Sequence, residues 1–336
     1  MKNTYEFGQS QAIESNQVRS SLQFNEHDKI TSIRDAYSFY LSKLIKRDKK
    51  LVLVDVDLGT VAKTLELKHE IKNRYIQVGI AEQNAIGIAA GVAQFGMKPI
   101  VQSLAVFLTG RAYDQIRESI SYSNLNVKLV GLHSGFTLSP DGATHQTGED
   151  IALMSSLPDM EIFAPADSRQ LKKLLPKFLN SKKAGYLRLF FPKAKNLSTN
   201  RFVYKKMEII KKIQKINIIS YGYMLQNGIK VQEMLEKINI KTGLINFHCL
   251  KPIDKKGLIT LSKKSKLLII VEDHNQFGGL GSQISQILSK KNPTKIISIN
   301  SNDKFGTTGL PDENLDYLGL SVKKIFEKIK NYVKKK

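Results

Sequence analysis

One acidic side chain, Glu82, stands at the start of a stretch of small and aliphatic residues. From Ala85 to Ala93 every face of the expected helix is apolar, which predicts a buried helix. Gly87 and Gly91 lie one turn apart and allow another backbone to approach closely. A carboxylate is rarely buried without a partner. Glu82 is therefore either an N-terminal acid favoured by the helix dipole or an acid that does chemistry.

Two histidines and an aspartate share a second stretch, the loop Leu132–Gln146, which contains glycine and proline. His133, Asp141 and His145 show no helical or strand periodicity that would place them in a core. Such side chains can bind a polar ligand. A zinc site needs three or four closely spaced ligands, and no cysteine or further histidine is near, so we predict no metal site here.

Phe107 follows an expected strand within a segment rich in charged and aromatic residues, and taken alone it is most simply a core residue. The chain has no phosphate-binding loop of the Gly-x-x-x-x-Gly-Lys-Ser/Thr type and no Gly-x-Gly-x-x-Gly fingerprint after its first strand. The glycine-rich segment Gly278–Ser282 is interpreted as a tight turn from a strand into a helix.

The elements that must position these residues are apolar runs that alternate with helical stretches. This pattern predicts an α/β fold, with mostly parallel sheets that carry helices on both faces. Ligands of such sheets gather at the carboxyl ends of strands, where Asp57 also lies. The expected strands are Leu51–Asp57, Pro99–Val101, Val127–Gly131, Glu161–Ala164, Gly185–Leu189, Ile216–Ser220, Thr242–Asn246, Leu267–Val271 and Lys295–Ile299.

The length of 336 residues predicts two domains. A charged link with few apolar residues, at about 193–206, separates an expected domain at 30–195 from one at 205–336. Residues 1–29 are polar and lack periodicity, so we expect a flexible N-terminal arm. Amphipathic helices are predicted at Ser32–Leu41 and Ser321–Lys336.

Composition narrows the function classes. The net charge of +22 comes mostly from lysines spread along the chain, without the arginine clusters and interleaved aromatics of a nucleic-acid surface, so we predict no nucleic-acid partner. A positive field suits phosphorylated substrates or acidic protein partners better. No apolar run is long enough to cross a membrane. The single cysteine, Cys249, and the lack of an apolar signal segment lead us to expect a reducing cytoplasm.

The motifs, taken together, resemble the transketolase family, and they occur in that family's order over residues 30–330. Those that resemble the pyrimidine-binding domain are Gly79–Asn84, Phe107, Asp141–Gln146, Leu157–Met160 and Ala164–Asp167. Those that resemble the C-terminal domain are the Gly278-Gly279 turn and Phe305–Gly309.

The resemblance implies a cofactor, thiamine diphosphate, which lies between two domains of different subunits in this family. It implies that Glu82 is a catalytic residue, because the family's acid hydrogen-bonds the aminopyrimidine ring and promotes the tautomer that activates the cofactor. Phe107 would stack on the pyrimidine, and Asp57 would lie near the cationic thiazolium ring. The cofactor supplies the carbanion chemistry, while the protein supplies orientation.

The resemblance also implies a sugar site. His133 and His145 match the family's sugar-contacting histidines, and His145 is expected to take part in catalysis. Asp141 would bind a sugar hydroxyl. Arg34 and Arg188 match arginines that hold the substrate phosphate.

Two positions depart from the family's pattern. The phosphate-binding serine that the family tends to have after Asp57 is missing, so that contact is lost or moves to Thr60, and Leu104 stands where an aromatic residue is expected. Both leave the choice of donor and acceptor sugar open.

A larger departure concerns the family's other half, which holds Mg²⁺ and the diphosphate through Gly-Asp-Gly and a downstream pair of asparagines. The chain has neither, since its Asp141-Gly142 pair belongs to the histidine loop. We therefore expect the C-terminal half of a split enzyme. Its partner would be an N-terminal subunit that holds Mg²⁺, in an α2β2 assembly acting on sugar phosphates.

Three alternatives remain open. Arg111–Gln115 also resembles deoxyxylulose phosphate synthases, although His133 favours a transketolase. A beta subunit of a 2-oxo acid dehydrogenase would leave the signature at 141–145 without a role. A binding protein without a cofactor is disfavoured by the intact Glu82.

Overall fold

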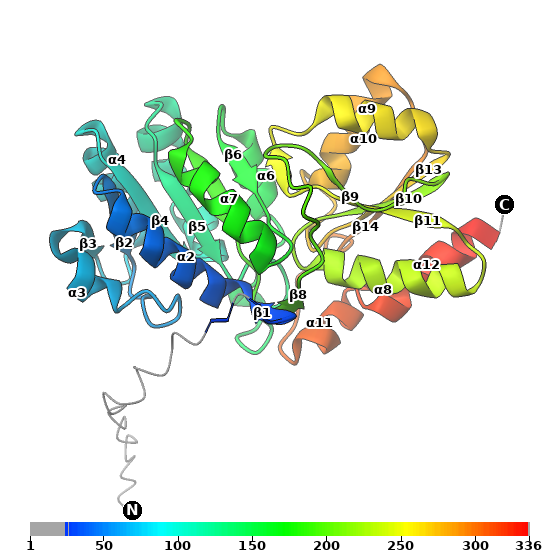
Figure 1. Ribbon diagram of the computed structural model, residues 1–336, viewed down its shortest axis with the longest axis horizontal. Helices are drawn as coiled ribbons and strands as arrows, with labels where there is room; N and C mark the ends of the chain where they lie inside the picture. Colours follow the sequence, from blue (N-terminus) through cyan, green and yellow to red (C-terminus); the bar gives the residue numbers. More distant parts are fainter. Residues whose placement is uncertain (1–23, 26, 335–336) are drawn as a thin grey trace, which may run out of the picture.

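Two large β-sheets, each covered by helices on both faces, form most of the structure, a computed structural model that describes residues 24–25 and 27–334 (Figure 1). The predicted α/β class with two mostly parallel sheets is confirmed. The N-terminal arm expected at 1–29 lies mostly outside the described residues.

The first sheet has seven strands in the order β12-β6-β7-β5-β4-β2-β3. Six of them are parallel, and β12, which comes from the second half of the chain, pairs antiparallel with β6. Their bounds are β2 (Leu51–Asp55), β3 (Tyr75–Gln77), β4 (Lys98–Leu104), β5 (Lys128–Leu132), β6 (Glu161–Phe163), β7 (Gly185–Arg188) and β12 (Cys249–Lys251).

Helices bury both faces of this sheet, as its apolar runs require. In β2, Leu51 and Leu53 belong to one apolar cluster and Val52 and Val54 to the other. The first cluster includes α2 (Ile33–Arg47), α3 (Leu67–Ile71) and α7 (Ser168–Asn180). The opposite face is covered by α4 (Glu82–Gln94), η3 (Phe107–Arg111), η4 (Ile116–Tyr122) and α6 (Asp150–Ser156). The short helices are η2 (Lys72–Arg74), α5 (Tyr113–Gln115) and η5 (Ala143–His145).

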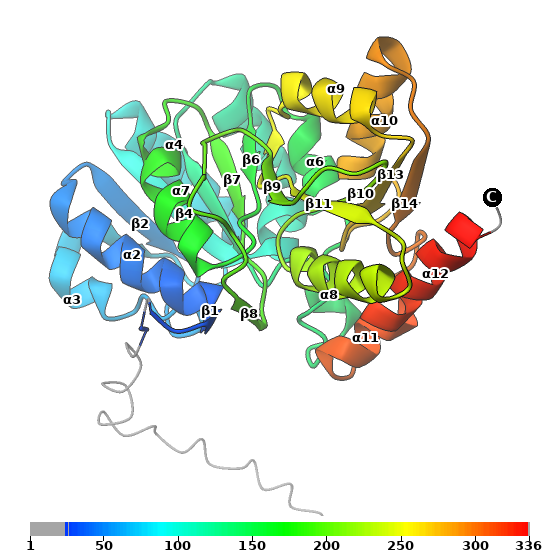
Figure 2. The same ribbon diagram turned by 45° about the vertical axis from the view of Figure 1, so that its right-hand side comes forward.

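The second sheet has the strand order β14-β13-β10-β11-β9, with only β9 antiparallel. Figures 1 and 2 show α8 and α12 along one side of it and α9 and α10 along the other. The strands are β9 (Glu208–Lys211), β10 (Ile216–Ser220), β11 (Thr242–Asn246), β13 (Leu267–Val271) and β14 (Ile296–Ile299). The helices are α8 (Met224–Lys237), α9 (Lys255–Lys264), α10 (Leu280–Lys291), α11 (Pro311–Tyr317) and α12 (Val322–Lys334).

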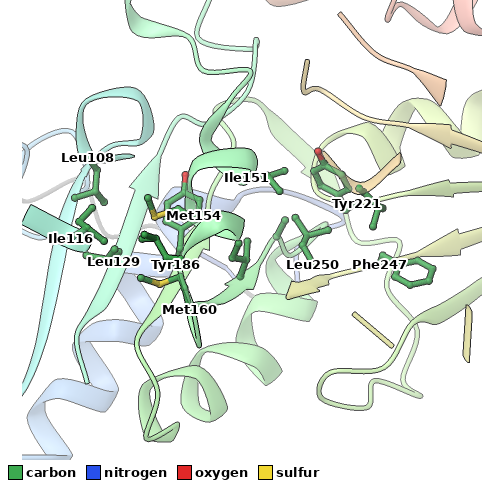
Figure 3. Packing of buried hydrophobic residues seen from close by; sticks show 14 of the residues in the cluster. Leu108, Ile116, Leu129, Ile151, Met154, Met160, Tyr186, Tyr221, Phe247 and Leu250 are labelled. Carbon is green, nitrogen blue, oxygen red and sulfur yellow. The ribbon is translucent and has the colours of Figure 1, made fainter. Parts of the chain in front are cut away.

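The link between the halves is tied back to the start of the first one. There, β1 (Ile30–Ser32) pairs antiparallel with β8 (Lys193–Lys195). One apolar core then runs from the first sheet into the second, with Tyr186 and Leu250 in strands of the first and Tyr221 and Phe247 just after strands of the second (Figure 3). The two halves therefore share a continuous core and a strand, β12.

None of the helices in the described part of the chain has the length and apolarity needed to cross a membrane.

One prediction about the fold is wrong. The helix after Glu82, α4, is not buried on every face. Ala85, Ile86 and Ala89 pack inside, but Gly87 and Gly91 are exposed, with nothing close to the place of a Cβ on either. An apolar pattern made of glycine and alanine does not identify the buried face, because those residues lose little when exposed. The exposed face is left free within this chain.

Candidate active site

The parallel order of neighbouring strands brings three candidate residues to one edge of the first sheet. β2, β4 and β5 are adjacent and in register, so their carboxyl ends lie side by side. Asp57 follows β2, Phe107 follows β4 and His133 follows β5. This is the edge at which ligands of α/β sheets bind.

Glu82 is the first residue of α4, and its side chain is only 2% exposed. Ser103, near the end of β4, donates a hydrogen bond to Glu82 Oε1 at 3.3 Å. Arg111 donates to Glu82 Oε2 from Nη1 at 2.7 Å. The Arg111 side chain is itself 45% exposed, so the cation that balances this buried acid is open to solvent.

Phe107 lies beside the same arginine. The Arg111 guanidinium carbon sits 4.4 Å from the centre of the Phe107 ring, within the range of a cation–π contact. His145 meets that ring edge-on at 5.2 Å between centroids. η3, which carries both Phe107 and Arg111, is π-helical, a form often found at functional sites. Glu82, Phe107, Arg111 and His145 therefore form one group.

His133 forms the centre of a second group. It is buried, has a positive φ of 54°, and packs edge-on against Phe191 at 4.8 Å. Burial, and to a smaller extent the positive charge of Arg34, lowers the pKa of His133 to about 4. The imidazole is therefore neutral at pH 7. Its Nε2 is buried without a hydrogen-bond partner in the structure, which suits a polar ligand.

Arg34, one of the two arginines predicted to bind the substrate phosphate, is partly exposed. It lies in the first turn of α2, and its Nε pairs with Asp35 Oδ1 at 3.2 Å. Lys63 pairs with the same oxygen at 3.3 Å. All three side chains are partly exposed. Arg34 can therefore turn part of its guanidinium to a ligand.

The remaining polar candidates are exposed or partly exposed. Asp141 is exposed in its loop, and His145 Nδ1 lies 3.0 Å from Thr144 Oγ1. Asp57 is exposed with a positive φ of 65°, and its backbone N–H donates to Gln77 Oε1 at 3.0 Å.

The buried acid at the end of β2 is Asp55, a residue that the sequence reasoning overlooked. Its carboxylate accepts hydrogen bonds from Gln77, Gln102 and the Gly59 backbone. Asp55 therefore braces the strand ends. Of the two departures from the family's pattern, Thr60 is exposed and Leu104 is buried.

The phosphate-binding role predicted for Arg188 is wrong. Its side chain is 1% exposed and lies between two carboxylates, with Nε 2.8 Å from Asp150 Oδ2 and Nη1 2.9 Å from Asp273 Oδ1. Nη2 donates to the Asp273 carbonyl at 3.0 Å. Although burial opposes the charged form, Asp150 and Asp273 raise the pKa of Arg188. Arg188 is a fixed cation between the two halves of the chain.

Two other residues at the site were also missed. Arg111 lies four residues after Phe107, and that spacing alone places the two on one helical face. Phe191 follows β7, and the position just after a strand was the available signal. What could not be read from the sequence is the distant partner of each, Glu82 for Arg111 and His133 for Phe191.

The residues at this edge fit one half of thiamine diphosphate. A buried carboxylate and an aromatic face stand together, and both now contact a single, partly exposed arginine. These are the groups that an aminopyrimidine ring needs for a hydrogen bond and for stacking. For the diphosphate half, residues 24–25 and 27–334 contain no group of three or more His, Cys, Asp or Glu side chains that could hold a metal ion.

Comparison with known proteins shows the family to which the chain belongs. The model described as the transketolase pyrimidine binding domain matches residues 29–197, and the transketolase C-terminal domain matches residues 205–325. The chain belongs to the transketolase family. Its resemblance to that family and its place among transketolase-type transferase subunits are thereby confirmed.

Relatives of similar length cover nearly the whole chain. The putative transketolase C-terminal section of Methanocaldococcus jannaschii is 33% identical, over 90% of this chain and 96% of the relative. The 6-deoxy-6-sulfo-D-fructose transketolase subunit of Clostridium sp. (strain MSTE9) is 30% identical, over 87% of this chain and 92% of the relative. A solved structure described as a split gene transketolase, an inactive beta4 tetramer, has a TM-score of 0.80 at 31% identity and covers 90% of this chain and 97% of that one.

Proposed function

We propose that this chain is the pyrimidine-binding subunit of a two-subunit, thiamine diphosphate-dependent transketolase that transfers a two-carbon ketol unit between sugars. The observation that carries the proposal is the buried Glu82 carboxylate next to the Phe107 ring, with an exposed arginine as its counterion. An acid that served only to cap α4 would have no reason to share its partner with an aromatic face.

Glu82 would bind the ring nitrogen of the aminopyrimidine and exchange a proton there, while Phe107 would stack on the ring and Asp57 would face the thiazolium side. Thiamine diphosphate, when bound, supplies the carbanion chemistry of ketol transfer. Glu82 is buried at the N-terminus of α4, where the low local dielectric strengthens its hydrogen bonds. Arg111 must move away from Glu82 before a ligand can take its place.

The sugar would bind on the side of His133. The neutral imidazole of His133 offers an unpartnered nitrogen to a hydroxyl, and Asp141 and His145 add groups from the same loop. Arg34 would attract the phosphate of a sugar phosphate, with Lys63 close to it through Asp35. A net charge of +22 favours the approach of anionic substrates.

The partner would be an N-terminal subunit that holds Mg²⁺ and the diphosphate. The exposed face of α4 supports such an assembly. Gly87 and Gly91 leave open space for a backbone, and Ile80 and Phe95, at the two ends of the helix, are large exposed apolar residues. Large apolar side chains that stay exposed at both ends of a helix suit an interface with another protein. Contacts between two copies of this chain would complete an α2β2 assembly.

Reconstitution tests this function. The purified chain is mixed with a separately expressed N-terminal transketolase section, with thiamine diphosphate and Mg²⁺ present. Ketol transfer from D-xylulose 5-phosphate to D-ribose 5-phosphate is then followed, together with thiamine diphosphate binding by calorimetry. We expect neither signal from the chain alone and both from the mixture. Full turnover by the single chain would contradict the two-subunit assignment.

A further inference from the structure

The loop that carries the sugar-binding candidates has almost no regular structure of its own. We define it as residues 133–149, the site loop, which contains His133, Asp141 and His145 and only one short 3₁₀ turn. Its internal backbone hydrogen bonds are few, among them the one from the Thr147 N–H to the Gly135 carbonyl at 3.1 Å, so a loop of this length also needs outside contacts to hold its side chains in place. In both ribbon views it runs beside α11 of the C-terminal half (Figures 1 and 2).

Asn314, in α11, makes the central contact with the site loop. It is fully buried, and its carboxamide bonds on both sides. Oδ1 accepts the Thr307 backbone N–H at 2.8 Å, while Nδ2 donates to the Phe136 carbonyl at 2.7 Å and to Gln146 Oε1 at 3.1 Å. Phe136 and Gln146 lie ten residues apart, so this one side chain joins the two arms of the site loop.

The turn before α11 holds the tip of the site loop. Gln146 Nε2 donates to the Thr307 carbonyl at 3.0 Å, and the Gly309 N–H donates to the Ser139 carbonyl at 3.3 Å. Gly142 has a φ of 80°, and a Cβ there would lie 2.9 Å from Thr308 Oγ1. Asp141 and His145 therefore sit directly beside residues that the C-terminal half fixes.

The base of the site loop rests on the segment after β13. The Asn275 N–H donates to the Gly148 carbonyl at 2.7 Å. Gly135, with a φ of 77°, lies so close to Asp273 that a Cβ would fall 1.9 Å from Asp273 Oδ2. The same Asp273 is paired with Arg188. Contacts from the C-terminal half thus reach the site loop at its base, both arms and its tip.

We propose that the C-terminal domain positions the sugar-binding loop, with Asn314 as the main positioning residue, so that His133, Asp141 and His145 face the substrate in a fixed arrangement. The inference rests on the proposed function for the identity of the substrate. The mechanical part does not, because it concerns only how the loop is held. Asn314 touches no reacting group. It acts through Phe136 and Gln146.

The test uses the assembled enzyme with the full-length chain and the variant Asn314→Ala. Amide hydrogen exchange is measured for residues 133–149 by mass spectrometry. The KM for D-xylulose 5-phosphate and the Kd for thiamine diphosphate are measured on the same samples. The matched control is Asn227→Ala, because Asn227 is also buried and bonds the Leu320 carbonyl at 3.0 Å, wholly within the C-terminal half.

We expect exchange in the site loop to rise at least about tenfold in Asn314→Ala and the KM to rise by a similar factor, since each lost hydrogen bond is worth roughly a factor of ten. The Kd for thiamine diphosphate should stay within about twofold, because Glu82 and Phe107 lie outside the site loop. Asn227→Ala should change neither loop exchange nor the KM.

Gln146→Met is the second variant. It removes the same bridge from the loop side at nearly constant volume and serves if Asn314→Ala does not fold. Unchanged exchange in the site loop of a folded variant would overturn the positioning role. Faster exchange with an unchanged KM would instead overturn the sugar-binding assignment of the loop, and with it the effect of positioning on catalysis.

Discussion

In the described part of the chain, two arginine–carboxylate groups have buried carboxylates, and they differ in the exposure of the arginine. Glu82 is buried and paired with Arg111, whose side chain is 45% exposed. Asp150 and Asp273 are buried and paired with Arg188, whose side chain is 1% exposed. The carboxylates alone look alike, since all three are closed off from water. The difference lies in whether the counterion can leave.

This difference separates a site from a structural clamp. Arg188 is held by two carboxylates and a carbonyl, so moving it would leave buried charges without a partner. Arg111 has one carboxylate and a ring face, and water can solvate it if it swings out. A ligand can therefore replace Arg111 at Glu82 at small cost, whereas nothing can replace Arg188. Burial of an acid is a weaker sign of function than the freedom of its partner.

The largest effect is expected at the closed group, which consists of Arg188 with Asp150 and Asp273. Arg188→Met keeps the length of the side chain but leaves Asp150 and Asp273 without their cation. Loss of one partner of a buried pair costs about 3–5 kcal/mol of folding free energy. Urea unfolding of the variant should show this loss. A loss below about 1 kcal/mol would mean that solvent reaches the group and that the contrast with Arg111 does not hold.

The next effect separates chemistry from stability at the open group, which consists of Glu82 and Arg111. Glu82→Gln keeps volume and hydrogen bonding but removes the acid, so turnover of the assembled enzyme should fall by about 10² or more. Folding should lose only about 0.3–1 kcal/mol, the size of a helix-dipole contribution. Steady-state kinetics measures the turnover, and urea unfolding measures the folding free energy.

Glu118→Gln is the matched control, because Glu118 pairs with Arg117 in an exposed ion pair on η4. Its turnover should stay at the wild-type level. If Glu82→Gln also kept wild-type turnover, Glu82 would be a helix-terminal acid and no more.

Much of the fold could be predicted because strand patterns are local. Every apolar run expected as a strand is one, and Ile216–Ser220, Thr242–Asn246 and Leu267–Val271 have the predicted bounds. The glycine-rich segment leads from a strand into a helix, as predicted. Glu272 caps the N-terminus of that helix, α10, by accepting hydrogen bonds from the N–H groups of Leu280 and Gly281. The antiparallel strand β12 was missed, because only the docking of the two halves gives it a partner.

The site was predictable where residue type and order suffice, and not where partners come from far along the chain. Glu82 was proposed from its place at the start of an apolar helix, His133 from its loop after a strand, and Phe107 from the resemblance to the family. Arg188 was misassigned because an arginine at a strand end is equally consistent with a phosphate contact and with a clamp. Its partner Asp273 lies 85 residues away in the sequence, so only the tertiary structure decides.

The smallest effect tests whether Arg111 is a placeholder or a binding residue. Arg111→Met removes the charge, and folding should lose less than in Arg188→Met, because water can reach Glu82 through the space that the half-exposed arginine leaves. If Arg111 only occupies the place of the aminopyrimidine, its removal should leave thiamine diphosphate binding to the assembled enzyme unchanged or up to about fivefold tighter.

Arg117→Met, which removes an exposed arginine on η4, controls for the loss of one positive charge. Binding more than about tenfold weaker in Arg111→Met, but not in Arg117→Met, would make Arg111 part of the cofactor site. The open group would then resemble the closed one more than its exposure implies, because its arginine would stay in place when the ligand binds.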